Sequence, residues 1–180
     1  APRAVLWLVP WSNLLQQTVK NLSDTDHPYR QKLNQLFQSR VEVYEKDQLL
    51  MGAGFNPTSV QEQLSIIVMS FASLRARKKE DRKVFQENGQ LAGFRDLYES
   101  NTHIKADTDD TALINVIRYL NPVVVVDESH NAESDLSVDM LKDLNPSVIL
   151  DLTATPKLNS NIISMVPALE LKKEQMVKLP

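Results

Sequence analysis

Short, continuously apolar segments alternate along the chain with segments whose apolar residues recur at helical spacing. The apolar segments predict buried strands at 4–9, 65–70, 123–126 and 147–152, and 41–44 is a short β-prone segment. The intervening periodicity predicts helices at 12–22, 28–38, 111–120 and 138–144. Apolar β-branched strands that alternate with helices are typical of a mostly parallel sheet covered on both faces. The hydrophobic pattern therefore predicts an α/β domain built in three layers.

Turn and capping residues indicate where these elements begin and end. Pro10 ends the first apolar run, and Ser12 is a suitable N-cap for the helix that follows. Asp110 is the predicted N-cap of a later helix, which Asn121 and Pro122 should end. The segment between these parts, 80–110, is the most charged and least periodic of the chain. We expect it to be an irregular or helical excursion from the core that is only weakly ordered.

Composition narrows the class of protein. The 180 residues include 20 Lys and Arg against 23 Asp and Glu, a formal net charge of -3, which excludes nucleic-acid binding by bulk positive charge. The absence of cysteine excludes disulfides and Cys-based zinc sites. No apolar run approaches the ~18 residues of a membrane span, and no signal segment opens the chain. We therefore expect a soluble, cytoplasmic protein that does not contact a membrane.

The two ends of the chain and its glycine content predict a piece of a longer protein. The chain opens without Met and runs almost at once into a strand, and it stops with no evident terminal element. It contains four glycines, where average usage of ~7% would give about a dozen. None of them belongs to a phosphate-binding G-x-x-x-x-G-K-[ST] loop.

The strongest chemical signal is a run of four valines, 123–126, followed directly by Asp127 and Glu128. Ligands of open α/β sheets bind at the carboxyl ends of the strands, where these acids lie. Carboxylates at the end of a buried strand would cost several kcal/mol unless a cation compensates them, and Mg²⁺ prefers such oxygen ligands. We predict that Asp127 holds Mg²⁺. Glu128, on the other side of the extended backbone, should align and deprotonate a water that attacks a γ-phosphate.

The surrounding charges agree with this hypothesis, and the competing interpretations explain the sequence less well. Between 121 and 151 there are seven acids and one lysine, so we expect a P-loop lysine from outside the chain to supply the positive partner. A solvated acidic turn is the alternative, and the valine run together with His130 makes it the minority interpretation. A serine hydrolase is disfavoured because neighbours on an extended chain point in opposite directions. The three histidines lack metal-ligand spacing, which argues against zinc.

A second signal follows the next predicted strand, where Thr153, Ala154 and Thr155 precede Pro156. Alone it indicates only a turn. Together, VVVVDESH and ILDLTATP resemble the Walker B motif (motif II, DEAH-type) and the Thr-Ala-Thr motif III of superfamily 2 helicases and translocases. The segment 8–18 is similar to motif Ia, a strand, loop and helix that contact the nucleic-acid backbone. The segment 66–71 is similar to the strand before a later DNA-contacting loop of that superfamily.

Two looser patterns narrow the resemblance. The segment Tyr119-Leu120-Asn121-Pro122 before the valine strand, and the tail from 166 to 180, are similar to the restriction (R) subunit of type III restriction-modification enzymes. The resemblance spans nearly the whole chain. It implies a first RecA-like motor domain at 1–180, truncated at both ends and lacking its P-loop, with a second RecA-like domain and a nuclease domain beyond Pro180.

The resemblance also implies function and the roles of single residues. It implies an ATP-dependent translocase on double-stranded DNA that is attached to an endonuclease and pairs with a modification methyltransferase subunit. In the full-length enzyme Asp127 would coordinate Mg²⁺–ATP and Glu128 would be the catalytic base, whereas this fragment alone is not expected to bind ATP and Mg²⁺ tightly. Asp127, Glu128 and His130 would bind the nucleotide, and His130 together with Thr153, Ala154 and Thr155 would couple the state of the nucleotide to DNA contact. The residues that would face the DNA backbone are Pro10, Trp11, Ser12 and Asn13.

Two features weaken parts of this picture, and three alternatives stay open. Trp11 occupies a position where a small or hydroxyl residue is commoner in the family, which weakens the expected contact with the DNA backbone. The basic run 75–83 is interrupted by acids, so we expect that run to be a solvated helix face. One alternative is another superfamily 2 DNA or RNA helicase. A second is a non-catalytic interaction module with a motor-like fold. A third is a Mg²⁺-dependent phosphotransfer domain with Asp127 as nucleophile, for which Lys157 is the one lysine we can name.

Overall fold

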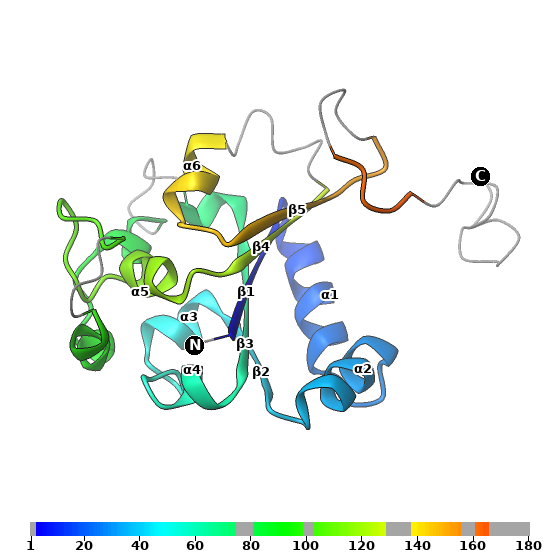
Figure 1. The fold of residues 1–180 in the computed structure, drawn as a ribbon, viewed down its shortest axis with the longest axis horizontal. Helices are drawn as coiled ribbons and strands as arrows, with labels where there is room; N and C mark the ends of the chain where they lie inside the picture. The colour runs from blue at the N-terminus through cyan, green and yellow to red at the C-terminus, as the bar shows by residue number, and fades with distance from the viewer. Residues whose placement is uncertain (1–2, 75–80, 99–102, 129–137, 156–160, 166–180) are drawn as a thin grey trace, which may run out of the picture.

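A computed structural model describes residues 3–74, 81–98, 103–128, 138–155 and 161–165 of the chain. Its described residues form one five-stranded sheet in which every strand pair is parallel, with the strand order β2-β3-β1-β4-β5. The strands are β1 (Arg3–Val9), β2 (Val41–Glu45), β3 (Leu64–Ser70), β4 (Val123–Asp127) and β5 (Val148–Leu152). The predicted α/β fold with a parallel central sheet is confirmed (Figure 1).

Helices lie on both faces of the sheet and complete the three layers (Figure 1). One face packs against α1 (Ser12–Ser23) and α2 (Pro28–Phe37). The elements on the other face are α3 (Lys46–Leu50), α4 (Ser59–Glu62), α5 (Leu113–Leu120), α6 (Val138–Asp143) and the 3-10 helices η1 (Phe71–Leu74), η2 (Asp81–Phe85) and η3 (Gly89–Leu97). Within the described part of the chain, no helix is long and apolar enough to cross a bilayer.

The two apolar clusters follow the alternation of side chains along β1, the middle strand. Leu6 and Leu8 are fully buried toward α5 and α6. Val5 and Trp7 point the other way and belong to the cluster formed with α1 and α2. On β4, Val124 and Val126 join the first cluster and are almost completely buried. The central strands are therefore continuously apolar because each face of the sheet meets a helical layer.

The helix starts differ from the capping prediction, whereas a predicted stop is confirmed. Helix α1 includes Ser12 as its first residue, and Trp11 occupies the N-cap position without a side-chain capping bond. Helix α5 begins at Leu113, with Ala112 rather than Asp110 at its N-cap. In both cases the side-chain type predicted a cap that the backbone does not use. Asn121 ends α5 as predicted, in the left-handed conformation with φ 47°.

The charged segment before α5 contributes to the core at three points. Val84, Leu91 and Phe94 are 0–1% exposed and belong to the larger apolar cluster. Their parent helices η2 and η3 are 3-10 helices, whose three-residue repeat does not produce α-helical periodicity. In its described residues the segment is therefore helical in part and packs against the core through these three side chains.

Strand β5 is more exposed than its sequence predicts. Val148 and Leu152 are 50% and 43% exposed, although the apolar run 147–152 predicts a buried strand. The strand is at the edge of the described sheet and pairs only with β4. Its position in the sheet order, which its own residues do not encode, explains the wrong prediction of burial.

Candidate functional site

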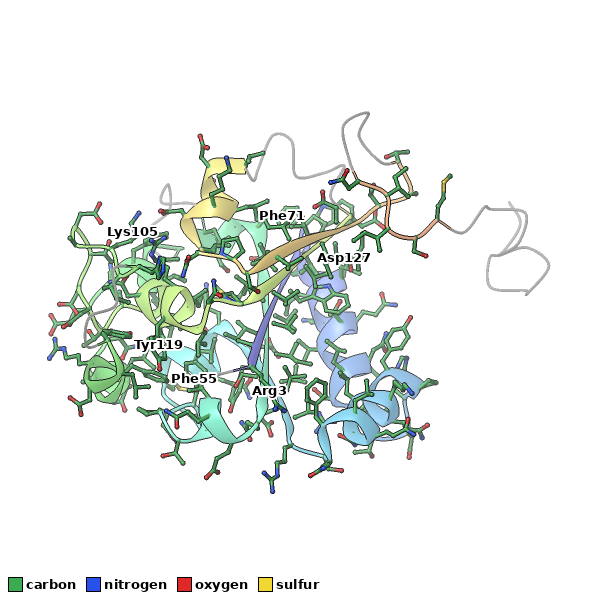
Figure 2. All side chains as sticks on the ribbon, viewed as in Figure 1. Arg3, Phe55, Phe71, Lys105, Tyr119 and Asp127 are labelled. Carbon is green, nitrogen blue, oxygen red and sulfur yellow. The ribbon has the colours of Figure 1, made fainter. Side chains whose placement is uncertain are left out.

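The carboxyl ends of the strands meet at one edge of the sheet because every strand pair is parallel. The residues at or just beyond these ends are Pro10 after β1, Asp127 on β4 and Thr153 after β5. Figure 2 shows Asp127 and Phe71 near this edge, whereas Arg3 lies at the opposite end of β1. The topology thus places the described residues of all three segments that carry the predicted site, 10–13, 127–128 and 153–155, at the same edge of the sheet.

Asp127 is the last residue of β4 and is half-buried. Its Oδ1 accepts a hydrogen bond from the backbone N–H of Glu128 at 3.0 Å. Its Oδ2 accepts a hydrogen bond from the indole Nε1–H of Trp7 at 3.3 Å. An ionised carboxylate has about four lone-pair sites, so these two bonds fix its orientation and leave acceptor capacity on both oxygens.

Glu128 follows with an unusual backbone. Its φ is 51°, in the left-handed region, which a residue with a side chain rarely adopts. The extended geometry of β4 therefore ends at Asp127, and the strict alternation predicted for the two carboxylates does not continue to Glu128. Such conformations cost of order 1–3 kcal/mol and cluster at active sites and ligand clamps. The hydrogen bond between Glu128 N and Asp127 Oδ1 helps to hold this backbone in place.

The segment Thr153–Thr155 lies beside the acidic pair. Asp127 is paired in register with Leu152, so Thr153 begins where the two neighbouring strands end together. The hydroxyl of Thr153 accepts a hydrogen bond from the backbone N–H of Thr155 at 3.1 Å, which closes a short turn. Thr153 is half-buried, and Ala154 and Thr155 are exposed.

The four residues from Pro10 to Asn13 form the turn from β1 into α1. Trp11 is 51% exposed, and Ser12 and Asn13 are also exposed. The side-chain oxygen of Asn13 accepts a hydrogen bond from the N–H of Leu14 at 2.9 Å. The first turn of a helix carries backbone N–H groups without intrahelical partners, and these favour anions.

Some predicted residues lie outside the described part of the chain. They are His130, Lys157 and residues 75–80 of the basic run. Among the described residues, no group of three or more His, Cys, Asp or Glu could hold a metal ion. Asp127 is thus not part of a cage of several carboxylates in the part of the chain that the structure describes.

Sequence reasoning missed Trp7. It lies in the middle of an apolar run, where a tryptophan is expected to serve only the core. Its bond to Asp127 joins residues 120 positions apart, and it depends on the register between β1 and β4. No local pattern encodes that register.

A search of curated proteins finds no match. A family model described as "Type III restriction enzyme, res subunit" matches residues 1–158, most of the chain. This family has a helicase-like domain of superfamily 2, and its RecA-like fold agrees with the parallel sheet and its helical layers. The chain therefore belongs to the family of type III restriction enzyme res subunits.

Proposed function

We propose that this chain is the ATP-hydrolysing part of a first RecA-like motor domain, which moves a type III restriction endonuclease along double-stranded DNA. The observation that carries the proposal is the pair Asp127 and Glu128 at the carboxyl end of β4, beside the turn at Thr153–Thr155. In the complete enzyme the motor would work with a modification methyltransferase subunit. The cytoplasm is the compartment that such an enzyme would occupy.

Asp127 has the chemistry to hold Mg²⁺. It offers two hard oxygen atoms, and each of them accepts only one hydrogen bond from the N–H donors described above. Mg²⁺ is usually held by one or two carboxylates together with waters and phosphate oxygens. A single carboxylate from this edge, with no larger cluster among the described residues, fits that pattern. When bound, Mg²⁺–ATP would supply the γ-phosphoryl group that water attacks.

Glu128 would accept the proton of the attacking water. A carboxylate at hydrogen-bonding distance of that water is a suitable general base. Its backbone is fixed in part by the hydrogen bond to Asp127, so the position of the base depends on the residue that would hold the metal. This dependence supports a shared role for the two acids rather than a solvated acidic turn.

The surrounding segments would connect the nucleotide to DNA. Thr153, Ala154 and Thr155 directly follow the strand that pairs with β4, and together with His130 they would couple nucleotide state to DNA contact. The exposed turn from Pro10 to Asn13 and the first N–H groups of α1 would bind backbone phosphates. A local contact of this kind suits a chain whose net charge is -3.

The test compares two substitutions in the complete enzyme. Asp127→Asn should weaken Mg²⁺-dependent ATP binding, whereas Glu128→Gln should leave ATP binding largely intact and abolish turnover. Glu62→Gln, on α4 and exposed, is the matched control and should leave both unchanged. Normal turnover in the Glu128 variant would contradict the assignment of Glu128 as the base, whereas no turnover in the unsubstituted complete enzyme would favour a non-catalytic module with a motor-like fold.

The isolated 180-residue chain should not hydrolyse ATP. Its sequence contains no glycine-rich loop to bind the phosphates, and phosphoryl transfer depends on positioning and charge stabilisation. Turnover by the isolated chain that is lost on Glu128→Gln would refute this expectation.

A further inference from the structure

Trp7 and Asp127 meet across the boundary between two strands. Trp7 on β1 is paired in register with Val125 on β4, and Asp127 lies two residues further along the same face. With strands about 4.8 Å apart and a rise of about 3.3 Å per residue, such diagonal neighbours are about 8 Å apart at their Cα atoms, a span that long or aromatic side chains bridge. The indole ring bridges it, and its Nε1–H donates to Asp127 Oδ2 at 3.3 Å.

We infer that Trp7 is a positioning residue for Asp127, and this inference rests on the proposed role of that carboxylate in holding Mg²⁺. An indole N–H can only donate, so it orients the oxygen that it meets as an acceptor. The second oxygen is held by the N–H of Glu128 at 3.0 Å. One donor from each side fixes the plane of the carboxylate before a metal arrives. Loss of such an outer hydrogen bond typically lowers metal affinity by about 10–100-fold.

The ring itself is held by packing. Trp7 is half-buried and belongs to the apolar cluster that includes Leu15 and Val19 of α1. A tryptophan that served only this cluster could be replaced by another apolar side chain at little cost beyond packing. A buried indole also commonly finds some hydrogen-bond partner. The experiment must therefore separate the loss of the N–H from the loss of packing.

Trp7→Phe removes the N–H while keeping an aromatic ring. Leu15→Ala is the matched control, because it removes packing from the same cluster and is not a hydrogen-bond partner of Asp127. The chain has two tryptophans, so its indole N–H resonances can be assigned by comparison with the Trp7 variant. In Asp127→Ala, with Trp7 intact, the Trp7 indole resonance should move upfield. An indole resonance that is indifferent to Asp127→Ala would overturn the inference.

The second measurement is a titration with Mn²⁺ alone, without nucleotide, followed by paramagnetic broadening of the Glu128 backbone amide. The apparent affinity should fall about tenfold in Trp7→Phe, the lower end of the effect of outer-shell partners. Leu15→Ala should leave the affinity unchanged. The inference would be overturned if the Trp7 variant and the unsubstituted chain bound Mn²⁺ with equal affinity, or if Leu15→Ala lowered the Mn²⁺ affinity as much as Trp7→Phe. It would also be overturned if Mn²⁺ did not broaden the Glu128 amide at all.

Neither measurement involves ATP turnover. If the complete enzyme proved not to hydrolyse ATP, the proposed function would fail, while the indole resonance and the Mn²⁺ titration would still decide the role of Trp7.

Discussion

Replacement of Asn115 by Ala should destabilise the chain far more than loss of an ordinary surface hydrogen bond. Asn115 lies on α5 and is 0% exposed. Its Oδ1 accepts from the backbone N–H of Lys105 at 2.8 Å, and its Nδ2 donates to the carbonyl of Asp109 at 3.0 Å. Two further contacts, to the carbonyls of Lys105 and Thr108, are 3.4 Å long and weaker. One side chain thus holds the segment 105–109 against α5, which leads directly into β4.

The magnitude follows from the two short bonds. Each protein hydrogen bond contributes about 0.5–1.5 kcal/mol net, and a buried partner left unpaired costs about 1–3 kcal/mol. Because both backbone groups lose their partner, we expect Asn115→Ala to lower the free energy of unfolding by about 2–4 kcal/mol. Urea denaturation should show a lower midpoint with an unchanged m-value.

Asn34→Ala is the matched control for this prediction. Asn34 is half-exposed on α2, and its Oδ1 accepts a side-chain hydrogen bond from Arg30 Nε at 3.0 Å. Its loss should cost below about 1 kcal/mol. Equal losses of unfolding free energy in the Asn115 and Asn34 variants would refute the reasoning that burial makes the Asn115 bonds expensive to lose.

Two further predictions concern charged groups around α5. The side chain of Asp143 is 43% exposed, and its carboxylate lies 2.8 Å from Lys105 Nζ. Asp143→Asn should therefore lower the free energy of unfolding, measured by urea denaturation, by only about 0.5–1 kcal/mol, and by less at high salt. A larger loss that salt does not reduce would contradict this prediction. Hydrogen bonds from the hydroxyl and the backbone N–H of Thr111 hold the pKa of Asp109 below its ordinary value. Because the pKa of Asp109 is depressed in the folded state, its carboxylate stabilises the fold above about pH 4 and loses that contribution as the pH falls through the folded pKa. Asp109→Asn should therefore reduce the fall in unfolding free energy at acid pH, measured by urea denaturation. If the unfolding free energy of Asp109→Asn fell with acid pH as steeply as that of the unsubstituted chain, the stabilising role of the Asp109 carboxylate would be wrong.

The parts of the fold that the sequence predicts are those whose physics is local. The segments 65–70 and 123–126 are apolar on both sides of the chain, and only a central strand buries both sides, so buried strands could be predicted there. Asn121 ends α5 because it tolerates the left-handed backbone there. The acidic pair and the threonine turn meet because parallel neighbouring strands end at the same edge.

The parts that could not be predicted depend on the arrangement of distant segments. The exposure of β5 follows from its place at the sheet edge, and its apolar residues look the same as those of a central strand. Phe94 is buried from a 3-10 helix without α-helical periodicity. The contact between Trp7 and Asp127 follows from a register of β1 against β4 that neither strand specifies alone.

The most direct test of the proposed motor is the single-turnover rate of ATP hydrolysis in the complete enzyme, measured with saturating ATP and double-stranded DNA. Loss of a general base typically lowers a rate by about 10²–10⁴-fold, so Glu128→Gln should hydrolyse bound ATP at least about 100-fold more slowly than the unsubstituted enzyme. The Glu62→Gln enzyme should match the unsubstituted one. A Glu128→Gln enzyme that hydrolyses bound ATP at the unsubstituted rate would contradict the claim that the acids at the end of β4 perform the chemistry.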